Sequence, residues 1–259
     1  MDLGISGRNA LVCGASAGLG YASADALARE GAAVTITGRD VTKLEAAADR
    51  LRAETGAKIT IAAGDITTEE GRAAALAVCP APDILITNAG GPPSGDFRQF
   101  TDAQWQAALN ANMLTPIALI RAVVDGMVAR RFGRIVNITS AAVKAPMQGL
   151  ALSNTARTGL TGFVAGVSRE VAWANVIINN ILPGPFDTGR LRRNLSPGPE
   201  IDNQAAERGM AAWAARIPAR RVGNPAEFGA ACAFLCSAHA GFIVGQNILL
   251  DGGEFNSTM

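Results

Sequence analysis

Short apolar strands alternate with helical stretches along this chain of 259 residues. Runs such as VTITG, ILITN and RIVNI are β-branched and apolar on both faces, which is typical of strands covered on both sides. Strands separated by helices predict βαβ units, and therefore an α/β fold with a parallel sheet flanked by helices on both faces. We expect seven strands, at residues 8–13, 33–38, 58–63, 83–88, 133–139, 176–182 and 247–250.

The composition favours a packed core and excludes several classes of function. Hydrophobic residues make up 49% and charged residues 17%, the reverse of the balance found in disordered chains. A formal net charge of +1 argues against a broad basic surface for nucleic acid. No apolar run approaches the ~20 residues that span a bilayer, and no signal peptide is visible, so we expect no membrane partner. The four cysteines form no CxxC pair, which predicts a reduced, cytoplasmic compartment.

The chain shows no linker, repeat or low-complexity segment, so we predict one domain over residues 1–259. Helices are expected at 19–30, 42–55, 102–129 and 153–174. The Pro/Gly-rich stretch 183–199 is interpreted as a long loop, and loops of that length usually cover or bind a ligand. A substrate-covering loop is therefore expected over about 184–218.

A glycine-rich turn joins the first predicted strand to the first helix. Gly14 allows a sharp turn, Gly18 lets the backbone approach a pyrophosphate, and Gly20 lets the helix pack on the strand. Ser16 and Leu19 lie between them, and the free N–H groups of the helix N-terminus favour phosphate. An ordinary βα turn can have the same glycines, but this position favours a dinucleotide site in a doubly wound, Rossmann-type fold.

The spacing GxxxGxG, followed in order by TNAG, NITSA, PGP and DGG, resembles the short-chain dehydrogenase/reductase superfamily. The chain is most similar in these motifs to 3-oxoacyl-[acyl-carrier-protein] reductases, and the resemblance covers its whole length. Two of the matching residues also have purely structural explanations, because Asn88 can satisfy backbone groups at a strand end and Asp65 can cap a turn. Beyond the glycine loop, the resemblance implies these cofactor-binding residues: Asp65, Ile66, Asn88, Ala89, Gly90, Arg157, Pro183, Gly184 and Thr188.

The end of the second predicted strand indicates which cofactor is used. Sites selective for NAD place an acidic residue there to hold the ribose 2′-OH. Here Gly38 occupies the position and Arg39 follows it, which removes repulsion against a 2′-phosphate and supplies a forked donor. We therefore predict NADP(H) as the cofactor; a surface arginine beside Asp40 is the alternative.

The catalytic motif of the superfamily is altered in this chain. The resemblance implies catalytic roles for Asn112, in the long fourth helix, and for Ser140, after the fifth strand. The superfamily places a Tyr thirteen residues after this Ser and a Lys four residues later, where this chain has Ser153 and Arg157. No shift of register restores the motif, because the only tyrosine is Tyr21. We interpret Ser153 and Arg157 as part of an atypical tetrad, one helical turn apart on a shared face.

This replacement has a chemical consequence. A serine hydroxyl is a much weaker acid than a tyrosine phenol, and losing a positioned general acid costs about 10²–10⁴-fold in rate. Proximity between the hydride donor and a carbonyl is not affected. Arg157 can still donate to ribose hydroxyls. Lys144 is a candidate replacement acid, although we favour a solvated surface lysine there.

Three hypotheses about function stay open. The first, which we favour, is an NADPH-dependent oxidoreductase that reduces a carbonyl, 3-oxoacyl-like substrate, slowly or with a replaced proton donor. The second is a non-catalytic NADP-binding homologue that acts as a regulatory or assembly partner. The third is another reaction on the same scaffold, such as dehydration or isomerisation.

The substrate is expected to be a small-molecule carbonyl compound, either free or linked to an acyl carrier or CoA. The arginines at 190, 192 and 193 can meet a phosphopantetheine or a carboxylate, or can simply be solvated. Arg131 and Arg169 match basic positions with which 3-oxoacyl-carrier-protein reductases dock the acidic carrier. No metal site is expected, since His239 is the only histidine and Cys232 and Cys236 suit core packing.

The helix expected over 153–174 carries Gly159, Gly162 and Gly166. Glycine costs about 1 kcal/mol per helical position relative to alanine, so close approach of another element is implied. Packing on the chain's own sheet is one explanation. The resemblance favours another, a homotetramer whose subunit interface this helix forms with the helix at 102–129.

Overall fold

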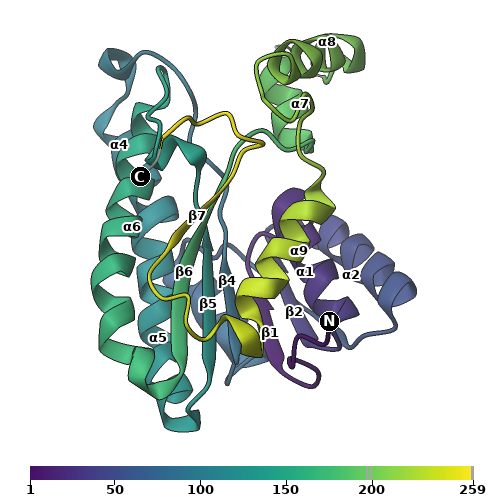
Figure 1. Ribbon diagram of the computed structural model, residues 1–259, viewed down its shortest axis with the longest axis vertical. Helices are drawn as coiled ribbons and strands as arrows, with labels where there is room; N and C mark the ends of the chain where they lie inside the picture. Colours follow the sequence, from purple (N-terminus) through teal and green to yellow (C-terminus); the bar gives the residue numbers. More distant parts are fainter. Residues whose placement is uncertain (197, 199, 258–259) are drawn as a thin grey trace.

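The computed structural model describes residues 1–196, 198 and 200–257. At its centre lies one parallel sheet of seven strands in the order β3-β2-β1-β4-β5-β6-β7 (Figure 1). The predicted strands are confirmed to within one residue at each end. They are β1 (Asn9–Val12), β2 (Ala33–Gly38), β3 (Ile59–Ala63), β4 (Ile84–Thr87), β5 (Gly133–Ile138), β6 (Val176–Pro183) and β7 (Asn247–Leu250).

The strand order reverses between β1 and β4, which are neighbours in the sheet although β2 and β3 lie between them in sequence. Chains that leave β1 and β4 therefore turn to opposite sides and open a crevice at the carboxyl edge of the sheet. The glycine loop follows β1 and Asn88 follows β4, so both lie at this switch point.

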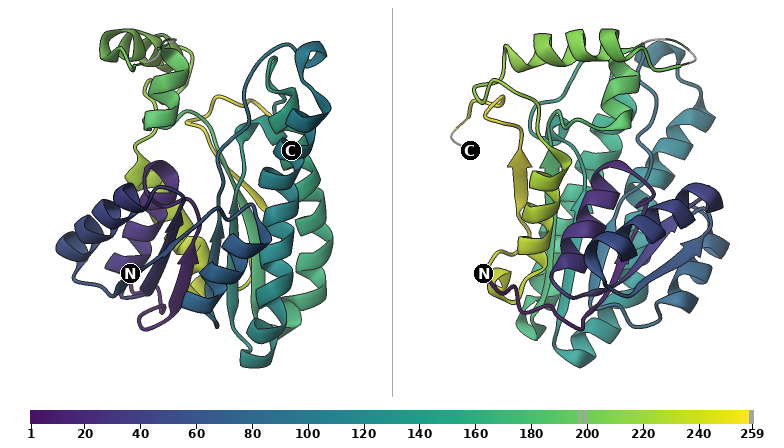
Figure 2. Two further views of the ribbon diagram at one scale, coloured as in Figure 1. Left: turned by 180° about the vertical axis from the view of Figure 1, so that it is seen from behind. Right: turned by 90° about the vertical axis from the view of Figure 1, so that its right-hand side faces the viewer.

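Two helices, α7 (Gly189–Leu195) and α8 (Asn203–Ala214), stand away from the sheet beyond its carboxyl edge (Figure 2). We call them the α7–α8 arm. The prediction of a long loop over 183–199 is wrong for α7, which begins where the side chain of Thr188 accepts a hydrogen bond from the Leu191 N–H at 3.2 Å. Pro197 and Pro199, the last prolines of that stretch, lie outside the described residues.

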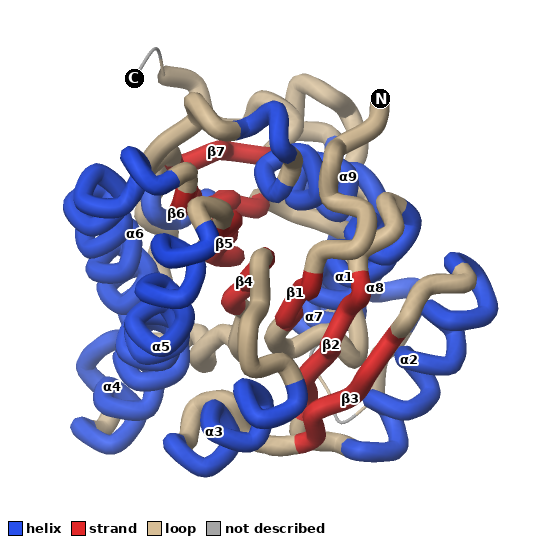
Figure 3. Tube along the Cα trace, turned by 90° about the horizontal axis from the view of Figure 1, so that it is seen from below, coloured by secondary structure: helices blue, strands red, loops and turns tan. Residues whose placement is uncertain are grey.

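The remaining helices cover both faces of the sheet (Figure 3). Alternate residues of β1 enter opposite cores, because successive side chains of a strand point to opposite faces. One core contains α1 (Gly18–Arg29), α2 (Val41–Thr55) and α9 (Pro225–Cys236), the other α3 (Glu69–Val78), α5 (Thr115–Arg130) and α6 (Ala151–Val171). Cys232 and Cys236 are buried in the first core, which confirms their packing role.

The helix predicted over 102–129 is not uniform. It consists of α4 (Asp102–Leu109), a π-helical turn η2 (Asn110–Leu114) and α5, a continuous stretch of 29 residues. Its mean hydropathy reaches 1.4 over 18 residues, so by length and composition alone it is apolar enough to cross a membrane, a test that core helices also pass. In this fold α5 instead places Leu119, Val123 and Met127 in the core.

The amino edge of the sheet is held by a buried cation. The side chain of Arg134 in β5 is 1% exposed and donates to the carbonyl oxygens of Ser237 and Asn175, both at 2.9 Å, and to Asn175 Oδ1 at 3.1 Å. Burial lowers the pKa of Arg134 to about 10, so the group stays charged at neutral pH with its donors occupied. This network joins β5, the turn before β6 and the end of α9.

Candidate active site

The glycine loop after β1 has the geometry predicted from its sequence. Gly14 and Gly18 adopt φ values of 58° and 62°, a region that favours glycine. A Cβ atom on Gly20 would overlap the carbonyl oxygen of Gly14, so only glycine lets α1 approach the loop this closely. Asn88 Nδ2 donates to that same carbonyl at 3.1 Å, which ties the end of β4 to the loop.

The N-terminus of α1 is left without a side-chain cap. Ala17 is its N-cap residue, and no side chain there accepts from the first N–H groups of the helix. Such free donors, with the positive end of the helix dipole, suit a phosphate group. Opposite them, the methyl carbon of Thr188 would lie 3.7 Å from a Cβ atom at Gly18. The described residues therefore fit a dinucleotide, whose pyrophosphate would meet α1 on one side and Thr188 on the other.

The residues predicted to meet the adenosine half of the cofactor lie at the carboxyl ends of β2 and β3. A Cβ atom at Gly38 would be 3.6 Å from Ser16 Oγ, so position 38 and the glycine loop face one another. Asp65 Oδ1 accepts from Thr67 N at 3.0 Å and from its hydroxyl at 2.8 Å, which confirms a turn-capping role. These hydrogen bonds hold the pKa of Asp65 below its usual value, and the nearby charge of the exposed Arg39 lowers that pKa further.

Other residues predicted to bind the cofactor also lie near this edge. The side chain of Ile66 is buried in the core, while Ala89 is half-buried and Gly90 is exposed. Gly90 faces open space, since a Cβ atom there would meet nothing within 4 Å. Cys13, directly before the glycine loop, is buried, which raises the pKa of its thiol to about 12 and keeps it neutral. We expect binding by backbone groups here rather than by Ile66 or Cys13 side chains.

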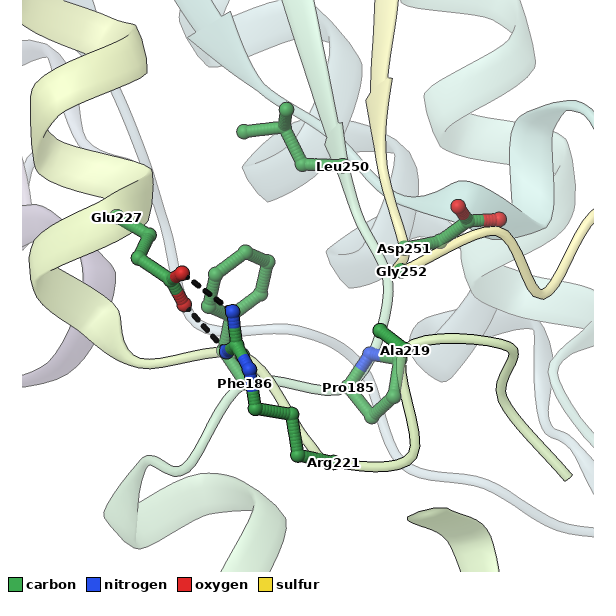
Figure 4. A pocket seen from close by; sticks show the side chains of 9 residues that line it. Pro185, Phe186, Ala219, Arg221, Glu227, Leu250, Asp251 and Gly252 are labelled. Carbon is green, nitrogen blue, oxygen red and sulfur yellow. Dashed lines mark hydrogen bonds and ion pairs between the residues drawn. The ribbon is translucent and has the colours of Figure 1, made fainter. Parts of the chain in front are cut away.

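The loop after β6 packs against the C-terminal segment. Gly184 N donates to the Leu250 carbonyl at 2.8 Å, and a Cβ atom on Gly184 would lie 2.7 Å from Cβ of Asp251. A pocket opens beside this contact (Figure 4), where the Arg221 guanidinium pairs with Glu227 at 2.6 Å. This pairing lowers the pKa of Glu227 to about 2. None of the predicted catalytic residues lines the pocket, so it is separate from the candidate catalytic group.

Asn112 lies in the π-helical turn rather than in a regular helix. Its side chain is 4% exposed and donates to the Ala108 carbonyl at 3.3 Å. Asn110 Nδ2 donates to the Thr67 carbonyl at 3.1 Å and anchors the turn beside β3. On its other side the turn packs on α6, where Met113 Sδ would be 2.5 Å from a Cβ atom at Gly159. Gly159 is thus explained by the close packing of α6 on the π-helical turn of the same chain.

Ser140 and Ser153 have different surroundings. Ser140 follows β5, and its hydroxyl oxygen accepts from Ala142 N at 3.1 Å, which leaves its proton free to be donated. Ser153, in the first turn of α6, is half-buried and forms no side-chain hydrogen bond with any described residue. Lys144 lies exposed at the end of the short turn after Ser140.

Arg157 points inward from α6. The residue is 9% exposed, and its Nη1 donates to the Ile138 carbonyl, at the end of β5, at 2.8 Å. Burial lowers the pKa of Arg157 to about 10, and the positive charge of Arg190 adds to the effect. Arg157 therefore stays protonated at neutral pH. The carbonyl that it binds, at Ile138, lies two residues before Ser140.

Arg190 is one of the three arginines that the sequence associated with a phosphopantetheine or a carboxylate, but its reach to the loop after β4 was not predicted. From α7 it donates across the crevice to the carbonyls of Gly91, at 3.0 Å, and Pro92, at 3.1 Å. Arg192, on the same helix, is occupied by a two-fold contact with Asp187 at 2.6 and 2.8 Å. The N-capping residue at position 188 was the available signal that this stretch is helical. A helix points Arg190 and Arg192 in different directions, which a loop would not predict.

Known proteins resemble the chain over nearly its whole length. A family model described as Enoyl-(Acyl carrier protein) reductase matches residues 14–254. Nodulation protein G of Rhizobium sp. (strain N33) is 33% identical over 249 residues, 96% of this chain and 97% of that protein. The 3-oxoacyl-[acyl-carrier-protein] reductase of Escherichia coli (strain K12) is 31% identical over 253 residues, 98% of this chain and 99% of the relative.

Solved structures agree with these relatives. L-Sorbose reductase from Gluconobacter frateurii, complexed with NADPH and L-sorbose, superposes with a TM-score of 0.93 at 29% identity, covering 99% of this chain and 100% of that one. A 3-oxoacyl (acyl-carrier-protein) reductase from Agrobacterium tumefaciens C58, with NADP bound, gives 0.86 at 28% identity, covering 97% and 96%. The chain belongs to the short-chain dehydrogenase/reductase superfamily. It is an oxidoreductase of that type, dependent on a nicotinamide dinucleotide and related to the 3-oxoacyl-carrier and nodulation G proteins.

Proposed function

We propose that this protein uses NADPH to reduce a carbonyl compound of the 3-oxoacyl type to an alcohol. The observation that carries the proposal is the placement of Ser140 and Arg157 at the carboxyl end of β5, the same edge of the parallel sheet at which the uncapped N-terminus of α1 follows β1. Relatives that resemble the whole chain include a 3-oxoacyl reductase and a sugar reductase, which supports reduction of a ketone.

The preference for NADPH rests on the end of β2. Gly38 presents no carboxylate, Ser16 lies beside it, and Arg39 is exposed and forms no hydrogen bond or ion pair with the described residues. A ribose 2′-phosphate would find a hydroxyl and a guanidinium there, with no carboxylate at position 38 to oppose it. The solved relatives with NADPH or NADP bound support this choice.

When bound, the reduced nicotinamide supplies a hydride to the carbonyl carbon, and one proton must reach the oxygen to give the alcohol and NADP⁺. Ser140 can donate a hydrogen bond to that oxygen, and the cationic Arg157 stabilises negative charge developing on it. Ser153 is the hydroxyl at the altered position, from which a proton relayed from water would arrive. A tyrosine would be the better acid, so we expect turnover about 10²–10⁴-fold slower than with an unaltered tetrad.

Oxidation of NADPH in the presence of 3-oxoacyl thioesters, diketones and quinones tests the proposal. The expected result is slow consumption of NADPH, matched mole for mole by alcohol. Tight NADPH binding without turnover on any of these compounds would contradict reduction and favour the non-catalytic homologue.

Delivery of the substrate by an acidic carrier is a separate question. Arg131 and Arg169 are exposed, but they lie toward the amino edge of the sheet, away from the crevice. At about 1.5 Å per residue, Arg169 is about 18 Å along α6 from Arg157. If a carrier docks there, changing both arginines to Glu should weaken reduction of a carrier-linked substrate more than of its small analogue; equal losses would contradict docking.

A further inference from the structure

Two guanidinium groups lie toward the carboxyl edge of the sheet without an acidic partner among the described residues, the buried Arg157 and the exposed Arg190. Arg157 reaches this edge from α6 and Arg190 from α7, and no carboxylate lies within ion-pair distance of either among the described residues. Their only hydrogen-bond acceptors are backbone carbonyls: Ile138 for the first, Gly91 and Pro92 for the second. The neighbouring Arg192, by contrast, is paired with a carboxylate.

A buried cation without a counter-ion is costly, and a second cation nearby adds to the cost. The other buried arginine of this chain, Arg134, has its donors occupied by carbonyl oxygens on three sides. Arg157 has a single acceptor, on Nη1. Its Nε and Nη2 have no partner among the described residues and are not fully buried, so these donors open onto a solvent-accessible space.

That space lies where the reaction is expected. Arg157 is attached to the end of β5, and Arg190 lies over the loop that follows β4. β4 and β5 are adjacent, with Thr87 paired to Asn137 at their carboxyl ends. Both cations therefore border the crevice that Ser140 also enters from the end of β5.

We propose that Arg157 and Arg190 together bind a carboxylate of the substrate, so that the compound reduced is a small oxo acid with its carboxylate close to the reacting carbonyl. This inference rests on the proposed function and narrows its substrate class. A guanidinium fork matches a carboxylate with two parallel hydrogen bonds, and an uncharged thioester or ester offers neither the charge nor the second oxygen.

Binding of malonate, an unreactive dicarboxylate, tests the anion site without turnover. Calorimetry is done with and without NADPH on the wild type, Arg190→Gln, Arg190→Lys and Arg193→Gln. Arg193 is the matched control, an exposed arginine on the same helix with no side-chain hydrogen bond to the described residues. Loss of one charge-assisted hydrogen bond should weaken malonate binding about 10–100-fold in Arg190→Gln, with little change in Arg193→Gln.

Arg190→Lys separates charge from the contact with the Gly91 loop. Lysine keeps the charge but lacks the fork, so Arg190→Lys should recover only part of the malonate affinity that Arg190→Gln loses. Equal losses in the Lys and Gln variants, or no malonate binding by the wild type, would overturn the inference. Thermal unfolding of each variant checks that the fold is intact.

Turnover provides the second readout. Acetoacetate and its neutral methyl ester present the same ketone with and without a carboxylate. We expect the wild type to reduce the acid with at least a 10-fold higher kcat/KM, and Arg190→Gln to lose this preference while still reducing the ester. A wild type that prefers the ester would overturn the inference but not the proposed function. If neither compound is reduced while malonate binds as expected, the proposed function fails and the anion site stands.

Discussion

Asn88 and Gly14 are joined by a hydrogen bond from Nδ2 to the carbonyl oxygen, 3.1 Å long, across 74 residues of sequence. This contact fixes the glycine loop against the end of β4. Replacing Asn88 with Ala leaves a half-buried carbonyl without its partner, so we expect a loss of about 1–3 kcal/mol in the free energy of unfolding and weaker cofactor binding. Urea unfolding and calorimetry measure both, with Asn88→Asp as a control of similar shape that lacks the donor. Unchanged values in both variants would contradict this role.

The second prediction concerns cofactor choice. Gly38→Asp places a carboxylate beside Ser16, where it repels a 2′-phosphate and can accept from a ribose hydroxyl. We expect the preference for NADPH over NADH to fall by at least about 10-fold, because the new carboxylate and the 2′-phosphate repel each other. Titration of both cofactors by tryptophan quenching measures it. Gly38→Asn adds nearly the same volume without the charge, and an equal effect in that variant would show that space, not charge, decides.

Restoring the superfamily's acid and cation is the third test. The double variant Ser153→Tyr/Arg157→Lys should gain about 10²–10⁴-fold in carbonyl reduction, the size expected from one general acid. The two changes should be non-additive, because the Lys lowers the pKa of the Tyr. NADPH affinity should change little, since most predicted cofactor contacts lie elsewhere. A folded variant that binds NADPH but reduces nothing would show that the pocket was not built for ketones.

The fourth prediction concerns assembly. Gly162 and Gly166 of α6 are exposed, and a Cβ atom at either would meet nothing within 4 Å, so packing within the chain does not explain them. We predict that a second subunit approaches there in a homotetramer. In a solvated helix the double change to Ala would stabilise the protein by about 1 kcal/mol per site; at a close interface it should instead weaken assembly. Light scattering at micromolar concentration distinguishes the cases, with Glu45→Ala on α2 as control. A monomeric wild type would contradict the prediction.

Acid stability provides the fifth prediction. The pKa of Glu227 is lowered to about 2 by the hydrogen bond from Arg221, so the carboxylate contributes stability above its unfolded pKa of about 4.5. This contribution is lost as the pH falls through about 2. Melting temperatures of the wild type and Glu227→Gln should therefore differ by a constant amount above pH 5 and converge between about pH 4.5 and 2. A difference independent of pH would contradict an ionic contribution.

The sheet could be predicted from sequence because its signal is local. Strands such as β2 and β5 are β-branched and apolar on both faces, and the burial of both faces leaves little alternative. The π-helical turn at Asn110–Leu114 could not be predicted, because a change in hydrogen-bond register leaves composition and periodicity almost unchanged. Likewise α7 was hidden in a segment rich in Pro and Gly, where the cap at Thr188 was the only helical signal.

The parts of the candidate site that a short sequence motif specifies could be predicted. The glycine loop and Asn88 lie where the sequence placed them. The inward direction of Arg157 and the reach of Arg190 to Gly91 depend on contacts across 19 and 99 residues, respectively. No periodicity encodes such pairings, so the contacts of these two arginines emerged only from the structure.

The contacts of Arg134 separate the stabilising network at the amino edge of the sheet from the candidate site at the carboxyl edge. The guanidinium of Arg134 donates hydrogen bonds to backbone carbonyls at the amino edge of the sheet. The residues proposed to bind the cofactor or to react lie toward the carboxyl edge, and Arg190 lies on the α7–α8 arm. Substitution of exposed site residues such as Arg39 should therefore change selectivity with little effect on folding, and loss of the Arg134 contacts should lower stability without changing the chemistry. Such a separation leaves the scaffold intact when residues of the site differ.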